Sequence, residues 1–273
     1  MGILLGNFLY AEGSFEKTLG KTAVNLEEYS FRFGLGTEYK TDKWGNNNYS
    51  SFVVPLDLAF GLTHHVELDL GVEYSKPYSF IDGSLIKDKT SYHNLYAGAR
   101  ILMNPDSISV KPAFGFWVGL YIPLHPYESW KPTASFLLSS AIGNLFSWNF
   151  NLGFSAYLNQ WAYKKNLQER IAPGGEVFIK LELGYPATDF FKILGGIDMK
   201  QHFLAKHYFT NGSSKKIDEF SSWKGVFAAR LKPIGLPMVF DAGVRIGFHK
   251  NAEETFSIFL QVQIIPDSAN AAW

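Results

Sequence analysis

Residues 51–74 read SFVVPLDLAFGLTHHVELDLGVEY, and they show the pattern on which the predicted fold depends. Before the turn, apolar residues alternate with small or polar ones: Phe52, Val54, Leu56, Leu58, Phe60 and Leu62 against Ser51, Asp57, Ala59 and Gly61. After the turn the alternation resumes, with Val66, Leu68, Leu70, Val72 and Tyr74 between Glu67, Asp69, Gly71 and Glu73. Successive side chains of a strand point to opposite faces. A period of two therefore predicts two strands, and the polar residues 63–65 predict a tight turn between them.

The same alternation recurs along the chain in segments of about ten residues, the length that a tilted strand needs to cross a bilayer. It predicts twelve strands, near residues 27–39, 51–62, 66–74, 92–102, 108–122, 133–142, 148–157, 176–185, 191–200, 223–232, 238–248 and 255–265. Outer-membrane barrels alternate apolar and polar positions in this way. We therefore predict an all-β fold, a transmembrane antiparallel up-and-down β-barrel of about twelve strands.

The predicted connections alternate in length. Short ones fall at 63–65, 103–107, 143–147, 186–190 and 233–237, and mostly longer, polar ones fall at 41–51, 75–91, 123–132, 158–175, 201–222 and 249–254. Short periplasmic turns and longer external loops are typical of outer-membrane barrels. An even number of strands places both ends of the barrel sequence on the periplasmic side.

A water-soluble β-sandwich or barrel is the main alternative for alternating strands. The polar face, however, is rich in glycine, at Gly34, Gly36, Gly71, Gly98, Gly115, Gly119, Gly153 and Gly184. A soluble exterior favours Thr, Lys and Glu, whereas glycine suits a crowded, curved wall. Aromatic residues also lie near strand ends on the apolar face, as an interfacial girdle requires: Tyr29, Tyr39, Phe60, Tyr74, Trp148, Tyr185, Trp223 and Phe248.

Composition excludes several functions. Lys plus Arg and Asp plus Glu are equal at 25 each, so no basic excess is available for nucleic acid. The absence of cysteine excludes a disulfide framework and a thiolate metal site. No phosphate-binding or dinucleotide motif is present, and we expect no cofactor and no metal. Residues 132–163 lack charge and could be read as a membrane helix, but asparagines and glycines interrupt them and the period is two.

The ends of the chain differ from the alternating part. Residues 1–26 include a short apolar run without a positive beginning, which is either a signal-peptide remnant or a periplasmic N-terminal segment. We expect the transmembrane barrel to span 27–265 and a short C-terminal tail to follow at 266–273.

The hairpin AFGLTHHVELDLGVEY, at 59–74, resembles one in the bacterial outer-membrane channel family of the MetA-pathway of phenol degradation. Looser similarities are Gly98 with Arg100 in NLYAGARIL, the strand ending GLYIP, and the segment NFNLGF. The resemblance implies a monomeric barrel that passes small, often hydrophobic or aromatic, compounds. The chain departs from such barrels at its end, because Pro266 to Ala272 separate the last strand from Trp273.

If apolar positions face lipid, the alternate positions face the lumen, and their charged residues become candidate lumen-lining residues. These are Glu28, Arg32, Glu38, Asp57, Glu67, Asp69, Glu73, Arg100, Lys111, Lys180, Glu182, Lys192, Lys200, Lys224, Arg230, Asp241 and Arg245, with Glu176 and Asp198 interleaved. Acids concentrate in the first three strands and bases in the later ones. One hypothesis is an acidic wall facing a basic wall across an open pore. The alternative is that the charges pair and plug a narrow lumen.

These features favour an outer-membrane channel for passive passage of small molecules. We expect its partners to be outer-membrane lipid, small-molecule solutes and the barrel-assembly machinery, with no nucleic acid. One alternative is a non-transporting surface or structural barrel that binds a partner through the loops at 158–175 and 201–222. A lipid hydrolase is another, but only Ser91 and His93 lie near the predicted outer rim, and no third member of a catalytic triad is evident. We therefore expect no enzymatic activity and no catalytic residues.

Overall fold

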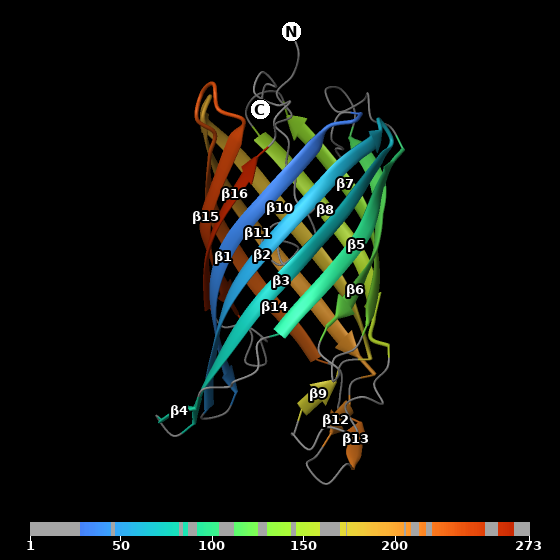
Figure 1. The fold of residues 1–273 in the computed structure, drawn as a ribbon, viewed down its shortest axis with the longest axis vertical. Coiled ribbons are helices and arrows are strands. Elements are labelled where there is room, and N and C mark those ends of the chain that lie inside the picture. The colour runs from blue at the N-terminus through green and yellow to red at the C-terminus, as the bar shows by residue number, and fades with distance from the viewer. Residues whose placement is uncertain are drawn as a thin grey trace.

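The computed structural model describes residues 28–44, 47–81, 84–86, 92–103, 112–124, 130–142, 146–158, 170–172, 174–204, 206–208, 213–216, 220–248 and 256–264. Twelve long antiparallel strands form a closed barrel whose strands are tilted against its axis (Figure 1). They are β1 (Phe31–Trp44), β2 (Asn47–Thr63), β3 (Val66–Ile81), β5 (Tyr92–Leu102), β6 (Ala113–Pro123), β7 (Lys131–Ile142), β8 (Phe146–Ala156), β10 (Gly175–Thr188), β11 (Phe191–Phe203), β14 (Phe220–Leu231), β15 (Met238–Gly247) and β16 (Phe256–Ile264).

The barrel closes where the first strand pairs with the last. β1 binds β2 on one side and β16 on the other, from Phe33 opposite Ile264 to Thr41 opposite Phe256. Closure leaves none of these twelve strands with an open edge, which satisfies the backbone hydrogen-bonding groups throughout the wall. The predicted fold class is confirmed.

Short connections gather at one end of the barrel, which we call the turn end. There, two-residue turns link Thr63 to Val66 and Thr188 to Phe191, and residues 232–237 link β14 to β15. At the opposite end, the loop end, four short strands lie beyond the wall (Figure 1). β4 (Ser84–Ile86) pairs with β3, whereas β9 (Arg170–Ala172), β12 (Lys206–Tyr208) and β13 (Ser214–Lys216) form a separate sheet.

The predicted strands are all present, but several predicted loops were wrong at their edges. Residues 41–51 are largely strand, because β1 continues to Trp44 and β2 begins at Asn47. β3 likewise extends to Ile81, into the predicted loop at 75–91, and β10 extends to Thr188, into the predicted turn at 186–190. A strand that continues past the apolar band still forms backbone hydrogen bonds with its neighbours, but its side chains need no apolar face there. The alternation of apolar and polar residues therefore ends before the strand does.

Where the structure describes residues 132–163, which were considered for a membrane helix, they lie mainly in two strands. β7 and β8 cover Lys131–Ile142 and Phe146–Ala156. Within the described part of the chain, no helix is long and apolar enough to cross a membrane.

Side chains of the wall separate by face. Large apolar residues such as Leu70 and Phe227 are 54% and 58% exposed on the outside, whereas the inward Arg32 and Arg245 are 1% and 0% exposed. The predicted girdle residues Tyr29, Tyr39, Tyr185, Trp223 and Phe248 are also exposed. An apolar outside around a polar inside is the arrangement of a barrel whose solvent is lipid.

Candidate functional site

The candidate site is the inner wall of the barrel, where alternate positions carry charge. Most of the residues suggested by the sequence are buried there: Arg32, Glu38, Asp57, Glu67, Asp69, Glu73, Arg100, Lys180, Glu182, Lys192, Lys224, Arg230, Asp241 and Arg245. Lys200 is half-buried. Lys111 lies outside the described residues.

Glu28 does not belong to the wall. It precedes β1 and forms an ion pair with His64 of the β2–β3 turn, where Glu28 Oε2 lies 3.4 Å from His64 Nε2. Both side chains are partly exposed, so this pair joins two segments at the turn end rather than lining the interior.

A first group of charges, the turn-end cluster, comprises Arg32, Glu67, Asp69, Arg100 and Trp117. Arg32 Nη2 lies 3.5 Å from Glu67 Oε1 and 3.7 Å from Asp69 Oδ1, and Arg100 Nη1 lies 3.4 Å from Glu67 Oε1. The Trp117 indole donates a 2.9 Å hydrogen bond to Asp69. All five side chains are buried. Two guanidinium groups thus neutralise acids that burial would otherwise destabilise.

Glycines on the predicted polar face make room for aromatic rings. A Cβ atom added to Gly98 or Gly119 would lie 2.5 Å or 2.1 Å from the Trp117 ring, so the indole covers both glycines. Tyr96 covers Gly71 in the same way and donates a 2.8 Å hydrogen bond to Asp57. At these three glycines the inner face is therefore filled by the aromatic side chains of Trp117 and Tyr96.

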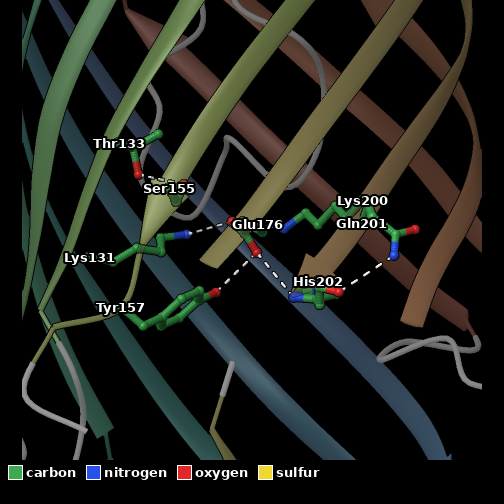
Figure 2. A network of polar contacts seen from close by, with 8 residues as sticks. All are labelled: Lys131, Thr133, Ser155, Tyr157, Glu176, Lys200, Gln201 and His202. Carbon is green, nitrogen blue, oxygen red and sulfur yellow. Dashed lines mark hydrogen bonds and ion pairs between the residues drawn. The ribbon is translucent and has the colours of Figure 1, made fainter. Parts of the chain in front are cut away.

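A second group, the loop-end cluster, surrounds Glu176 at the start of β10. Figure 2 shows Lys131 and Tyr157 approaching this carboxylate from one side and Lys200 and His202 from the other. Glu176 Oε1 lies 3.6 Å from Lys131 Nζ and 4.0 Å from Lys200 Nζ. Glu176 Oε2 accepts a 3.0 Å hydrogen bond from Tyr157 and lies 3.7 Å from His202 Nδ1. Positive groups outnumber the single carboxylate here.

The lysines of the loop-end cluster are more accessible than the arginines of the turn-end cluster. The Lys131 and Lys200 side chains are each 15% exposed, against 2% for Arg32 and 0% for Arg100. Lys131 Nζ also lies 4.5 Å from the centre of the partly buried Tyr121 ring, within range of a cation–π contact.

Two further ion pairs complete the charged wall. Arg245 Nη1 lies 2.7 Å from Glu38 Oε1, and Lys40 Nζ lies 3.2 Å from Glu38 Oε2. Arg230 donates two hydrogen bonds, of 2.7 Å and 2.9 Å, to the Asp241 carboxylate. Parallel bonds between a guanidinium and a carboxylate fix both groups in orientation as well as position.

The contacts described above run along the wall. Apart from the Glu28–His64 pair at the turn end, each joins residues on, or directly after, one strand, adjacent strands or strands separated by one other, as Arg32 on β1 reaches Glu67 on β3. None of these contacts joins opposite sides of the barrel. Acids of the first three strands therefore find bases beside them, as Glu67 does in Arg32 and Arg100.

Sequence reasoning missed several of these residues. It placed His202 and Lys131 in external loops, but His202 is fully buried in β11 and Lys131 begins β7. Lys40, Tyr96, Trp117 and Tyr157 were also not singled out. Extending the alternation beyond the apolar part of each strand would have found Lys40 and His202, because they keep the parity of the inward residues.

Among the described residues, no group of three or more His, Cys, Asp or Glu side chains could hold a metal ion. His65 Nδ1 lies 3.0 Å from the carbonyl oxygen of Leu102, a contact that secures the turn. Ser91 lies outside the described residues, so the Ser91–His93 hypothesis remains untested.

No model of a known protein family matches this sequence, and no curated protein matches it. Solved structures do match. An outer membrane channel from Pseudomonas putida F1 has a TM-score of 0.67 at 11% sequence identity, over 89% of this chain and 97% of that one. A KdgM porin has a TM-score of 0.48 at 8% identity, over 85% of this chain and 98% of that one. The CymD monoaromatic hydrocarbon channel has a TM-score of 0.45 at 7% identity, over 88% and 89%. At 11% identity, the likeness to the Pseudomonas putida channel shows a shared barrel fold and no more.

Proposed function

We propose that this protein is an outer-membrane channel through which small molecules cross the bilayer passively. The main observation behind the proposal is that the ion pairs of the inner wall run around the wall and not across the barrel. They connect near-neighbour strands and so lie along the wall. Pairs arranged in this way neutralise charge along the wall without tying opposite sides of the barrel together, and the partly exposed Lys131 and Lys200 leave charge that a solute can reach.

The apolar exterior supports the membrane location. Outward residues such as Leu35, Leu70 and Ile258 are exposed along the strands, where contact with water would be unfavourable and contact with lipid is not.

The solute class that we propose is small and hydrophobic or aromatic. Its support is the resemblance of the hairpin at 59–74 to channels of phenol degradation. The partly buried ring of Tyr121, beside Lys131, offers such a solute both an aromatic surface and a cation on the inner wall.

Single-channel recording in planar bilayers tests the proposal. The refolded wild-type protein is expected to give stepwise currents. In a potassium chloride gradient, Lys131→Gln with Lys200→Gln is expected to shift the reversal potential toward that of a cation-selective pore, because two accessible positive charges are removed. Lys76→Gln is the matched control, since Lys76 is exposed on the outward side of β3, and it should leave the reversal potential unchanged.

Two results would exclude the channel. One is the absence of current from protein that is folded and inserted. The other is an equal shift in the control variant, which would mean that the measured selectivity does not arise on the inner wall.

A further inference from the structure

The small sheet at the loop end is strongly basic. Its three strands carry Arg170, Lys206, His207, Lys215 and Lys216, and they contain no Asp or Glu. Lys206, Lys215 and Lys216 are exposed. Asp218 and Glu219 follow in the sequence, outside the described residues.

The register of this sheet places like charges together. β12 pairs with β13 so that Lys206 stands directly opposite Lys216. Two like charges at directly opposed positions of an antiparallel pair destabilise it. On its other side Lys206 pairs with Ala172, which supplies no counter-charge. Neither residue paired with Lys206 carries a negative charge, and a bound anion would supply one.

The sheet lies close to the end of a barrel strand, which places it near the membrane surface. Phe203 ends β11, and Lys206 begins β12 only three residues later, so the two Cα atoms are at most about 11 Å apart. Each headgroup layer of a bilayer is roughly 5–8 Å thick. A lysine that follows so soon after a barrel strand is within reach of this layer.

Exposed apolar residues mark the hydrocarbon boundary just below. Leu204, between β11 and β12, is 60% exposed, and Trp130 and Leu158 are exposed at the same end of β7 and β8. The Leu158 amide donates a 2.8 Å hydrogen bond to the Trp130 carbonyl, so the two lie side by side. Tryptophan is enriched at the interface between hydrocarbon and headgroups.

We propose that the sheet β9–β12–β13 binds the phosphate groups of an anionic glycolipid in the leaflet that surrounds the loop end. The occupant is a membrane lipid because the basic strands continue directly from a lipid-facing rim. Lys206 and Lys216 hold the phosphates, and Leu204 and Trp130 contact the upper part of the acyl chains. The inference rests on the membrane placement proposed above, but it does not require that the barrel conduct.

The test titrates refolded, full-length protein in neutral detergent micelles with diphosphoryl lipid A, and in parallel with its dephosphorylated form and with inorganic pyrophosphate. The wild-type protein is expected to bind the diphosphoryl form most tightly. Lys206→Gln with Lys216→Gln is expected to weaken that binding by about 30-fold, since each lysine near an anionic surface contributes about a factor of five. Lys206→Arg with Lys216→Arg should retain it. The control, Lys232→Gln, removes a lysine at the turn end, at the opposite end of the barrel from the sheet, and should bind as the wild type does.

The glutamine variant should also fold. It removes the opposed like charges, so in detergent without lipid its melting temperature is expected to equal or exceed that of the wild type. Equal affinity for lipid A with and without phosphate would overturn the proposal, as would equal affinity for pyrophosphate or an equal loss in the control. A protein that binds the lipid but passes no current would keep this inference and lose the channel.

Discussion

The turn-end and loop-end clusters both place basic side chains beside buried carboxylates, but they differ in the type and the exposure of the basic residue. At the turn end, Arg32 and Arg100 are almost completely buried beside Glu67, and Arg32 also lies near Asp69. At the loop end, Lys131 and Lys200 remain partly exposed around Glu176. A guanidinium is more weakly hydrated than an ammonium, so it is more readily buried beside carboxylates, whereas an ammonium on a flexible stem stays hydrated. Charge in the first cluster is therefore enclosed in the wall, while charge in the second remains partly exposed.

The largest expected difference is in stability. Arg32→Met should lower the free energy of unfolding by about 3–5 kcal/mol, because it leaves buried acids with less compensation. Lys200→Met should cost less than about 1 kcal/mol, because its ion pair is long and its side chain reaches solvent. Urea unfolding in lipid vesicles, followed by tryptophan fluorescence, measures both. Equal losses would contradict the division of roles between the clusters.

The next effect tests the packing of the turn end. Gly119→Ala should lower the free energy of unfolding by about 1–3 kcal/mol, because the new methyl group would overlap the Trp117 ring. Gly195→Ala is the control, since a Cβ there meets nothing within 4 Å. The same unfolding assay applies. If Gly119→Ala were as stable as the control, the indole would have room to move and the turn end would not be tightly filled.

The smallest effect compares two tyrosine hydroxyl groups. Tyr96→Phe removes a buried hydrogen bond to Asp57 and should cost about 1.5 kcal/mol. Tyr157→Phe removes a part-buried bond to Glu176, which keeps Lys131 and Lys200 beside it, so the loss should be under about 1 kcal/mol. A larger loss for Tyr157→Phe would show that the loop-end cluster also has a structural role.

The position of the strands could be predicted from the sequence because each strand crossing the bilayer must be apolar on one face and polar on the other. This constraint is local, and it identified all twelve strands of the barrel. It lapses where strands leave the membrane, which is why Lys43 and Trp44 were assigned to a loop although they continue β1.

Alternation also determined which charges point inward, as Arg32 and Asp241 illustrate, but not which charges meet. Partners were decided by the closure of the barrel and by its register, which bring Arg245 of β15 against Glu38 of β1 across β16. Such pairs are far apart in the chain, and a shift of one residue would turn either side chain to lipid. A barrel with an apolar outside and a charged inside could therefore be predicted from the order of residues. That some of those charges bind one another in a closed wall while Lys131 and Lys200 stay partly exposed could not, because pairing depends on neighbours in three dimensions.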